Sequence, residues 1–193
     1  MKRNWIYFIA LCLSFFAFAP ALLAAETFTL DPNHSYVLYH INHLGFSTQT
    51  GKWPAEGTLI LDKQKPQLSK VTVTIPIAGM VTGNNELNEH LQGKNFFDIA
   101  HYPVATFTST KITLQGKDAA KVQGTLTLHG VSKPVTLDVK FTKEGVNPIT
   151  NKPTVGFSGK TKLKRSDFGI TTLVPSLGDE VTLDIQVEAA KAG

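Results

Sequence analysis

Alternation of apolar and polar residues predicts that most of this chain forms short β-strands. In the clearest run, 69–78, Val71, Val73, Ile75 and Ile77 share one face while threonines occupy the other. That pattern is typical of a strand with one dry and one wet face. Similar runs occur at 26–31, 34–43, 51–62, 104–114, 121–129, 135–142, 154–163 and 181–187. Trp53-Pro54 interrupts the third of these, and a proline there indicates a sheet edge or a bulge.

One helical insertion breaks this series of strands. It begins at Glu86, and Leu87 and Leu91, four residues apart, fall on one helix face. Gly93 is predicted to end the helix in a left-handed conformation. Two adjacent aromatic residues, Phe96 and Phe97, follow before the next strand.

The strands predict an all-β domain over residues 26–193. They are mostly separated by short turns, such as the glycine-containing turn at 129–133, so the architecture is a sandwich or a barrel. We favour an antiparallel barrel of about eight strands, because no strand carries obvious edge protection and closure removes edges. The glycines within strands also suit the bends of a small barrel; they are Gly57, Gly124, Gly156 and Gly159. A barrel of this size can hold one small ligand.

The first 25 residues have the pattern of a cleaved secretory signal peptide. Lys2 and Arg3 precede a mostly apolar run at 6–18, and small residues end the segment at Ala24 and Ala25. The apolar run is shorter than the roughly 20 residues of a membrane-spanning helix. The only cysteine, Cys12, lies inside this segment, so the exported domain would depend on its core rather than on disulfides.

Charge gives no reason to expect a nucleic-acid partner. The chain has 19 Lys and Arg against 15 Asp and Glu, and without Lys2 and Arg3 the balance is 17 against 15. A basic cluster made of Lys160, Lys162, Lys164 and Arg165 is interpreted as a solvated strand face.

The sequence shows no catalytic or metal-binding constellation. His40 and His43 are three residues apart in a predicted strand, so they point to opposite faces and do not form a metal site. His90 and His101 flank the helical insertion without an evident carboxylate partner. The run Gly156-Phe157-Ser158-Gly159 lacks the spacing and the strand-to-helix context of a hydrolase nucleophile elbow. We therefore expect no enzyme activity, no metal and no cofactor.

Several motifs, in order along nearly the whole exported chain, resemble the YceI-like family of exported lipocalin-like proteins. The matching segments are His34 with Val37, Tyr39 and Ile41, His43-Leu44-Gly45-Phe46-Ser47, Asn88-Glu89-His90-Leu91, Phe96-Phe97-Asp98, Tyr102-Pro103-Val104-Ala105-Thr106-Phe107, the stretch 124–135, Arg165, and Asp167-Phe168-Gly169-Ile170. The residues Gln92-Gly93-Lys94 depart from the family pattern, in which this position is usually charged.

The resemblance implies an extended eight-stranded antiparallel lipocalin-like barrel in the periplasm. Its elongated pore would hold an isoprenoid chain, typically the tail of a quinone-like lipid; some relatives hold other long-chain amphiphiles. A strand of about ten residues spans about 33 Å, which suits an extended tail. The resemblance is also compatible with a homodimer and with transient contact to a membrane or membrane protein.

The residues expected to line the pore are the inward-facing apolar side chains of these strands, together with the aromatic pair at one mouth. They are Val37, Tyr39, Ile41, Phe46, Val73, Ile75, Phe96, Phe97, Phe107, Leu126, Val139, Phe157 and Leu183. Three alternatives stay open: a binder of fatty acids or amides, an enzyme acting on such a lipid with His43 or His90 as base, and a solid-cored interaction or stress protein.

Overall fold

The structure, a computed structural model, describes residues 25–193. The predicted signal peptide and its cleavage site therefore lie almost entirely outside the described residues. The described chain forms ten strands and one α-helix. The strands are β1 (Glu26–Leu30), β2 (Tyr36–His43), β3 (Ser47–Pro54), β4 (Glu56–Leu61), β5 (Lys70–Pro76), β6 (Val104–Leu114), β7 (Ala119–Leu128), β8 (Val131–Val146), β9 (Pro153–Lys164) and β10 (Leu177–Lys191); the helix is α1 (Asn85–Gln92). Three short 3₁₀ helices complete the set: η1 (Pro66–Leu68), η2 (Ile77–Gly79) and η3 (Arg165–Phe168).

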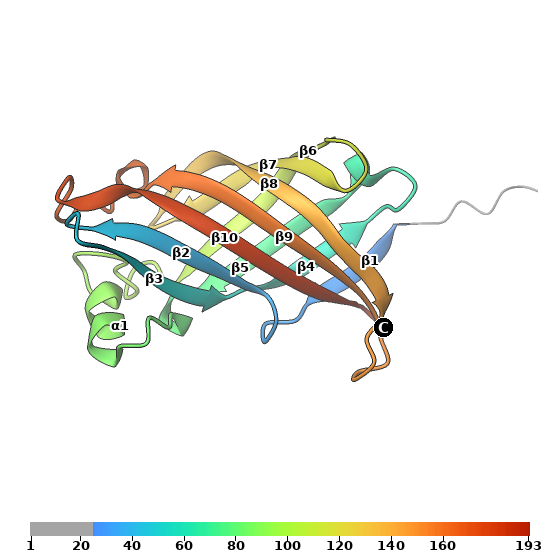
Figure 1. The fold of residues 1–193 in the computed structure, drawn as a ribbon, viewed down its shortest axis with the longest axis horizontal. Coiled ribbons are helices and arrows are strands. Elements are labelled where there is room, and N and C mark those ends of the chain that lie inside the picture. Colours follow the sequence, from blue (N-terminus) through green and yellow to red (C-terminus); the bar gives the residue numbers. More distant parts are fainter. Residues whose placement is uncertain (1–24) are drawn as a thin grey trace, which may run out of the picture.

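The strands form one antiparallel sheet that closes into an eight-stranded barrel, which confirms the predicted fold. Its order is β1-β4-β5-β6-β7-β8-β9-β10, and β10 pairs back with β1. The hairpin of β2 and β3 extends this barrel, because β2 pairs with the rest of the β10 edge, from Leu177 to Gln186. Strands β1 and β2 thus lie end to end along β10 (Figure 1). Strands β4 and β3 likewise lie end to end, β4 paired with β1 and β3 paired with β2.

A buried serine holds the junction between β1 and β2. Ser35 is fully buried, and its hydroxyl donates to the Glu188 carbonyl at 2.9 Å and accepts from the Glu188 N–H at 3.1 Å. Its own carbonyl accepts from the N–H of Ala55, the residue between β3 and β4, at 2.9 Å. These hydrogen bonds continue the sheet across the break between β1 and β2 and across the break between β4 and β3.

One turn and one helix end differ in detail from the predictions. The turn between β7 and β8 consists of His129 and Gly130 alone, both with positive φ, as a tight two-residue hairpin requires. Strand β8 therefore begins at Val131, four residues before the predicted start. Gly93 follows α1 with φ −69° and ψ 168°, so the prediction of a left-handed helix end was wrong.

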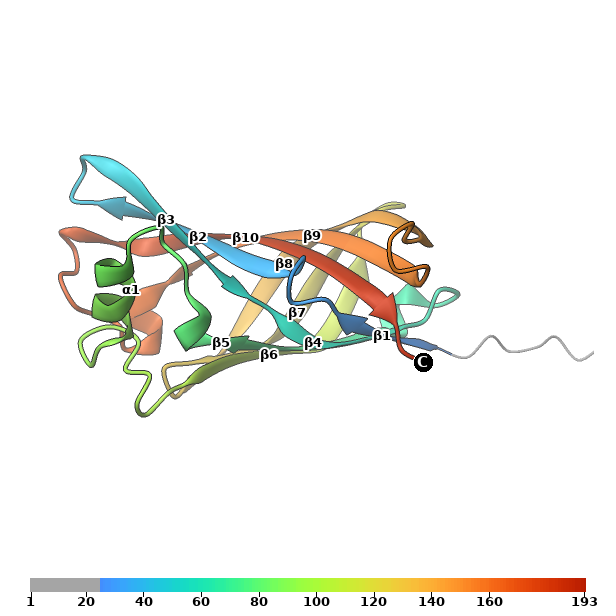
Figure 2. The ribbon, with the colours of Figure 1, turned by 90° about the horizontal axis from the view of Figure 1, so that it is seen from below.

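Helix α1 lies at one end of the barrel, and the C-terminus lies at the other (Figures 1 and 2). At the helix end, β3 and β5 are not paired with each other, and the segment 77–103 lies between them. Val81 of this segment forms an isolated bridge with Lys52 of β3. The interior at the C-terminal end is packed around Phe28, Leu30 and Val155. No helix within residues 25–193 has both the length and the apolar character needed to span a membrane.

Candidate functional site

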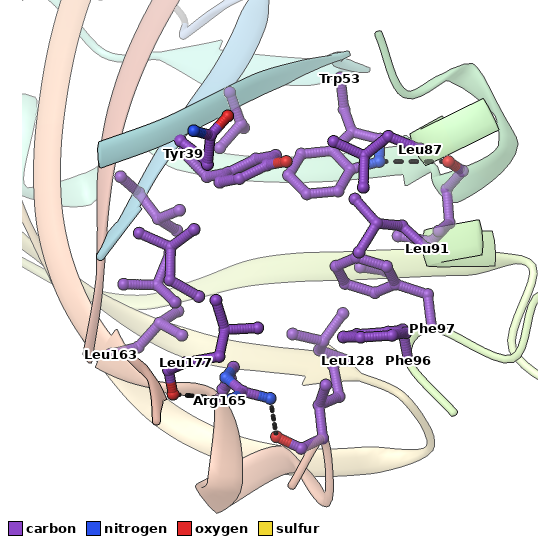
Figure 3. A pocket seen from close by; sticks show the side chains of 18 of the residues that line it. Tyr39, Trp53, Leu87, Leu91, Phe96, Phe97, Leu128, Leu163, Arg165 and Leu177 are labelled. Atoms are coloured by element: carbon purple, nitrogen blue, oxygen red, sulfur yellow. Dashed lines mark hydrogen bonds between the residues drawn. The ribbon is translucent and has the colours of Figure 1, made fainter. Parts of the chain in front are cut away.

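The helix end of the barrel encloses an apolar cavity of about 470 Å³. Strand β2 supplies one wall with Val37, Tyr39 and Ile41, because alternate residues of a strand point to the same side. The rest of the wall comes from β10, which pairs with β2, from β5, β6, β7 and β9, and from α1 (Figure 3). The volume falls within the range of protein pockets that enclose small-molecule ligands.

Three aromatic rings form a packed corner of this cavity. The Tyr39 and Trp53 ring centroids are 5.1 Å apart at 41°, and those of Trp53 and Phe97 are 5.4 Å apart at 81°. The indole Nε1 of Trp53 donates to the Ile77 carbonyl at 3.1 Å, which satisfies its only polar atom. The corner therefore presents rigid, apolar ring surface to the interior.

Helix α1, within the segment between β3 and β5, forms part of the cavity wall. Its Leu87 and Leu91, which share one helix face by their spacing, both line the cavity. The N–H of Phe97 donates to the Leu91 carbonyl at 3.0 Å, which turns the aromatic pair back beneath the helix. The Phe96 ring lies 5.0 Å from the His90 ring. One wall of the cavity is thus a helix and loop rather than a strand.

Tyr39 and Arg165 are buried polar residues on this mostly apolar wall, which also includes the more exposed His43, Gln49 and His90. Tyr39 is 7% exposed, burial raises the pKa of its hydroxyl, and that hydroxyl has no hydrogen-bond partner among residues 25–193. Arg165 is 6% exposed, and burial lowers its pKa while nearby Asp179 opposes that shift. No aspartate or glutamate of the described chain lines the cavity.

Eight of the thirteen residues expected at the pore lie on the wall of this cavity. They are Val37, Tyr39, Ile41, Ile75, Phe96, Phe97, Leu126 and Leu183. The orientation of β2, ambiguous from its sequence, is settled by the burial of Val37 and Tyr39. Whether these side chains contact a ligand stays a prediction.

The other five lie elsewhere. Phe46 is 89% exposed in the turn between β2 and β3, beyond the end of the barrel. Phe107 is buried in a packed cluster, against which Val73 and Val139 also pack. Phe157 packs against the cluster at the C-terminal end of the barrel. Apart from Phe46, these residues face the barrel interior, but they lie along the part of the barrel that is filled with packed side chains.

Trp53 and Arg165 also line the cavity, although neither is among the residues expected at the pore. The sequence held a signal for the arginine. Lys160, Lys162 and Lys164 alternate along β9 and point outward, so the next residue, Arg165, belongs to the inner face. Because Arg165 follows three exposed lysines, it is grouped with them as part of a solvated face, although it lies on the inner face.

The histidines do not form a metal site or a catalytic pair. His40 lies 3.0 Å from the Asp184 carboxylate on the outer face, whereas His43 lines the cavity, as their spacing in a strand predicted. His101 lies 2.9 Å from the Asp98 carboxylate in an exposed loop. Within residues 25–193 no three metal-binding side chains come together.

Known proteins place this barrel in a family. A family model described as the YceI-like domain matches residues 28–189. Protein YceI of Salmonella arizonae is 36% identical over 192 residues, which cover 99% of both chains. The chain belongs to the YceI-like family. The resemblance noted from its motifs is thereby confirmed.

Solved structures share the YceI-like barrel. BcnA of Burkholderia cenocepacia superposes with a TM-score of 0.72 at 26% identity, covering 82% of this chain and 98% of that chain. A polyisoprenoid-binding domain from Saccharophagus degradans superposes with a TM-score of 0.65 at 16% identity, covering 86% and 99%. At that low identity the second likeness shows the fold alone.

Proposed function

We propose that this protein is a periplasmic carrier that holds a polyisoprenoid or quinone-like long-chain lipid in the cavity at the helix end of its barrel. The cavity is the main observation behind this proposal: it is about 470 Å³ in volume and is lined mostly by aliphatic and aromatic side chains. Burial of a lipid tail there would contribute about 25 cal/mol per Å² of apolar surface, before the cost of ordering the tail.

Membership of the YceI-like family supports this class of ligand. The Saccharophagus degradans domain with the same fold is described as polyisoprenoid-binding. Fatty acids and their amides are the alternative ligands, because they offer the same kind of apolar tail to the same wall.

The cavity favours binding over catalysis. Its histidines, His43 and His90, have no carboxylate partner among the described residues, and His90 packs against Phe96 instead. General acid–base chemistry requires a proton-transferring group held at hydrogen-bond distance from the reacting atom. The proposed role is therefore non-covalent and needs no cofactor.

Periplasmic location and membrane contact are part of the proposal. The N-terminal segment with Lys2, Arg3 and the apolar run at 6–18 supports export. Apolar side chains are exposed beside the cavity, with Leu44 44% and Leu173 61% exposed, and Phe46 extends beyond them. They would meet the bilayer from which a lipid ligand is taken.

Filling the cavity tests the proposal. Leu183 lines it from β10, opposite Tyr39 of β2 in the register. Leu183→Trp is expected to weaken uptake of a long-chain ubiquinone at least about tenfold, measured by displacement of the neutral dye N-phenyl-1-naphthylamine. Because the ring enters existing space, the free energy of unfolding should change by less than the roughly 1–3 kcal/mol of an overpacked solid core.

Ile60→Trp is the matched control, because Ile60 is exposed on β4 and does not line the cavity. Equal quinone uptake by both variants would show that the quinone does not bind in this cavity. A wild-type protein that binds neither the dye nor the quinone would refute the carrier function itself.

A further inference from the structure

A buried arginine lies in the apolar wall of the cavity without a carboxylate partner. Arg165 belongs to η3 and is 6% exposed. Figure 3 shows it across the cavity from Tyr39 and Trp53. No carboxylate within residues 25–193 forms a salt bridge with it. An arginine keeps its charge even when buried, and a buried charge is costly unless it is compensated.

Backbone carbonyls compensate only part of this charge. The Nε of Arg165 donates to the Gly178 carbonyl at 2.8 Å, Nη1 to Ile170 at 3.1 Å, and Nη2 to Leu177 at 3.0 Å. A guanidinium has five N–H donors, so two remain, one on each terminal nitrogen. The carboxylate of Asp179, whose charge acts on Arg165, accepts hydrogen bonds from the N–H and hydroxyl of Ser166, at 2.9 and 2.8 Å.

The three carbonyls also fix where the guanidinium lies. The Ile170 carbonyl comes from the connection between β9 and β10, and the carbonyls of Leu177 and Gly178 come from the start of β10. The side chains of Ile170 and Leu177 line the same cavity. This connection and α1 occupy the same end of the barrel (Figures 1 and 2). The positive charge is thus held near the open end, while the apolar wall continues inward through Leu126 and Val37.

We propose that Arg165 is the head-group site of this cavity and selects ligands whose polar end carries acceptor oxygens, such as a carboxylate or a quinone carbonyl. Such an oxygen supplies the missing partner for the two remaining N–H groups, and charge-assisted hydrogen bonds of this kind are the strong ones. The tail then extends inward along the apolar wall. An ammonium head is rejected, because it has no acceptor and carries the same charge as the arginine.

This inference rests on the proposed lipid-binding function, and the experiment separates the two. Palmitic acid, hexadecanol and hexadecylamine share one chain and differ in the head. Wild-type protein is expected to release bound N-phenyl-1-naphthylamine at about tenfold lower palmitic acid than hexadecylamine, or lower still. Displacement by none of the three contradicts lipid binding itself. Equal displacement by all three leaves lipid binding intact and overturns the role of Arg165.

Two variants locate the preference. Arg165→Gln removes the charge and is expected to bring the three ligands to within about threefold of one another, while the neutral dye still binds. Lys164→Gln is the matched control: it removes an equal charge from the adjacent exposed position, outside the cavity, and should keep the wild-type order. If Lys164→Gln abolishes the preference as fully, the effect is long-range charge and the proposal fails. If Arg165→Gln does not fold, the wild-type comparison still decides.

Discussion

At the scale of single residues, close packing of Phe107 against Gly124 shows how the filled part of the interior is built. Gly124 lies on β7, two residues before Leu126, which pairs with Phe107. A Cβ added at Gly124 would lie 2.3 Å from Phe107 Cζ and 2.6 Å from the Thr108 carbonyl oxygen. The ring therefore occupies the space that any other residue at this position would need.

Gly124→Ala is expected to destabilise the protein by about 1–3 kcal/mol, because the ring or the strand must move. Chemical denaturation measures this. Gly145→Ala on β8 is the control, since the nearest atom to its added Cβ is 3.7 Å away, and that substitution should be close to neutral. Similar losses in both variants would mean that strand glycines matter here for a reason other than packing.

Side-chain direction could be predicted from the sequence, but depth along the barrel could not. The alternation in β5 correctly placed Ile75 inside. The alternation in β6 placed Phe107 inside, yet it fills the core rather than lining the cavity. Period-two patterning reports which face a residue occupies, whereas the boundary between filled and open interior depends on which side chains meet across the barrel.

At the scale of elements, α1 is a short helix held by its N-terminal cap. Asn84 accepts a hydrogen bond from the Leu87 N–H at 3.2 Å through its side-chain oxygen. The Asn88 side chain accepts from the N–H and hydroxyl of Thr82, at 2.9 and 2.8 Å. An eight-residue helix is marginal by itself, so these bonds and the contacts of Leu87 and Leu91 keep it on the cavity.

Asn84→Ala should cost about 0.5–2 kcal/mol of helix stability through loss of the cap. Because α1 forms part of the cavity wall, its amides should exchange hydrogen faster and the bound dye should dissociate faster. Barrel amides should be unaffected. Asn85→Ala, at the next position and without a side-chain hydrogen bond to the helix, is the control. Unchanged dye release despite faster exchange would show that ligands do not pass α1.

The helix and the strands were largely predictable, because each has its own local pattern. The joins between them were not. The run 51–62 spans the end of β3 and all of β4. Proline marked the break between them, but it did not show that Ser35, in the connection between β1 and β2, bridges that break. Long-range partners of this kind leave no local periodicity, and for the same reason Arg165, whose partners lie on β10 and in the preceding connection, was not recognised as part of the site.

At the scale of the whole molecule, the barrel closes where its first and last strands meet. Glu26 of β1 forms ion pairs with Lys191 of β10 and, at 2.6 Å, with Lys63, which also pairs with Glu144 of β8 at 2.5 Å. These lysines lower the pKa of Glu26 from its ordinary value to about 2. The cluster joins strands from both ends of the sequence.

A lowered pKa fixes the sign of the pH dependence. The ionised form of Glu26 stabilises the folded state above its unfolded pKa, and this contribution is lost as the pH falls from about 5 towards about 2. Glu26→Gln should therefore lower Tm at neutral pH by a small amount, since the cluster is partly exposed, and the difference from wild type should vanish in acid. Glu56→Gln, an exposed carboxylate on β4 without an ion pair among the described residues, should show no such change. A Tm difference for Glu26→Gln that persists in acid would contradict this assignment.

The complete barrel combines a filled end and an open end, and the central claim is that the open end holds a lipid. Lipid extraction and mass spectrometry of protein purified from its native compartment test that claim most directly, with Leu183→Trp purified in parallel. We expect close to one long-chain lipid with an acceptor-oxygen head per wild-type chain, and clearly less in the variant. Wild-type protein that is repeatedly empty, and that also fails to take up quinone, would contradict the account.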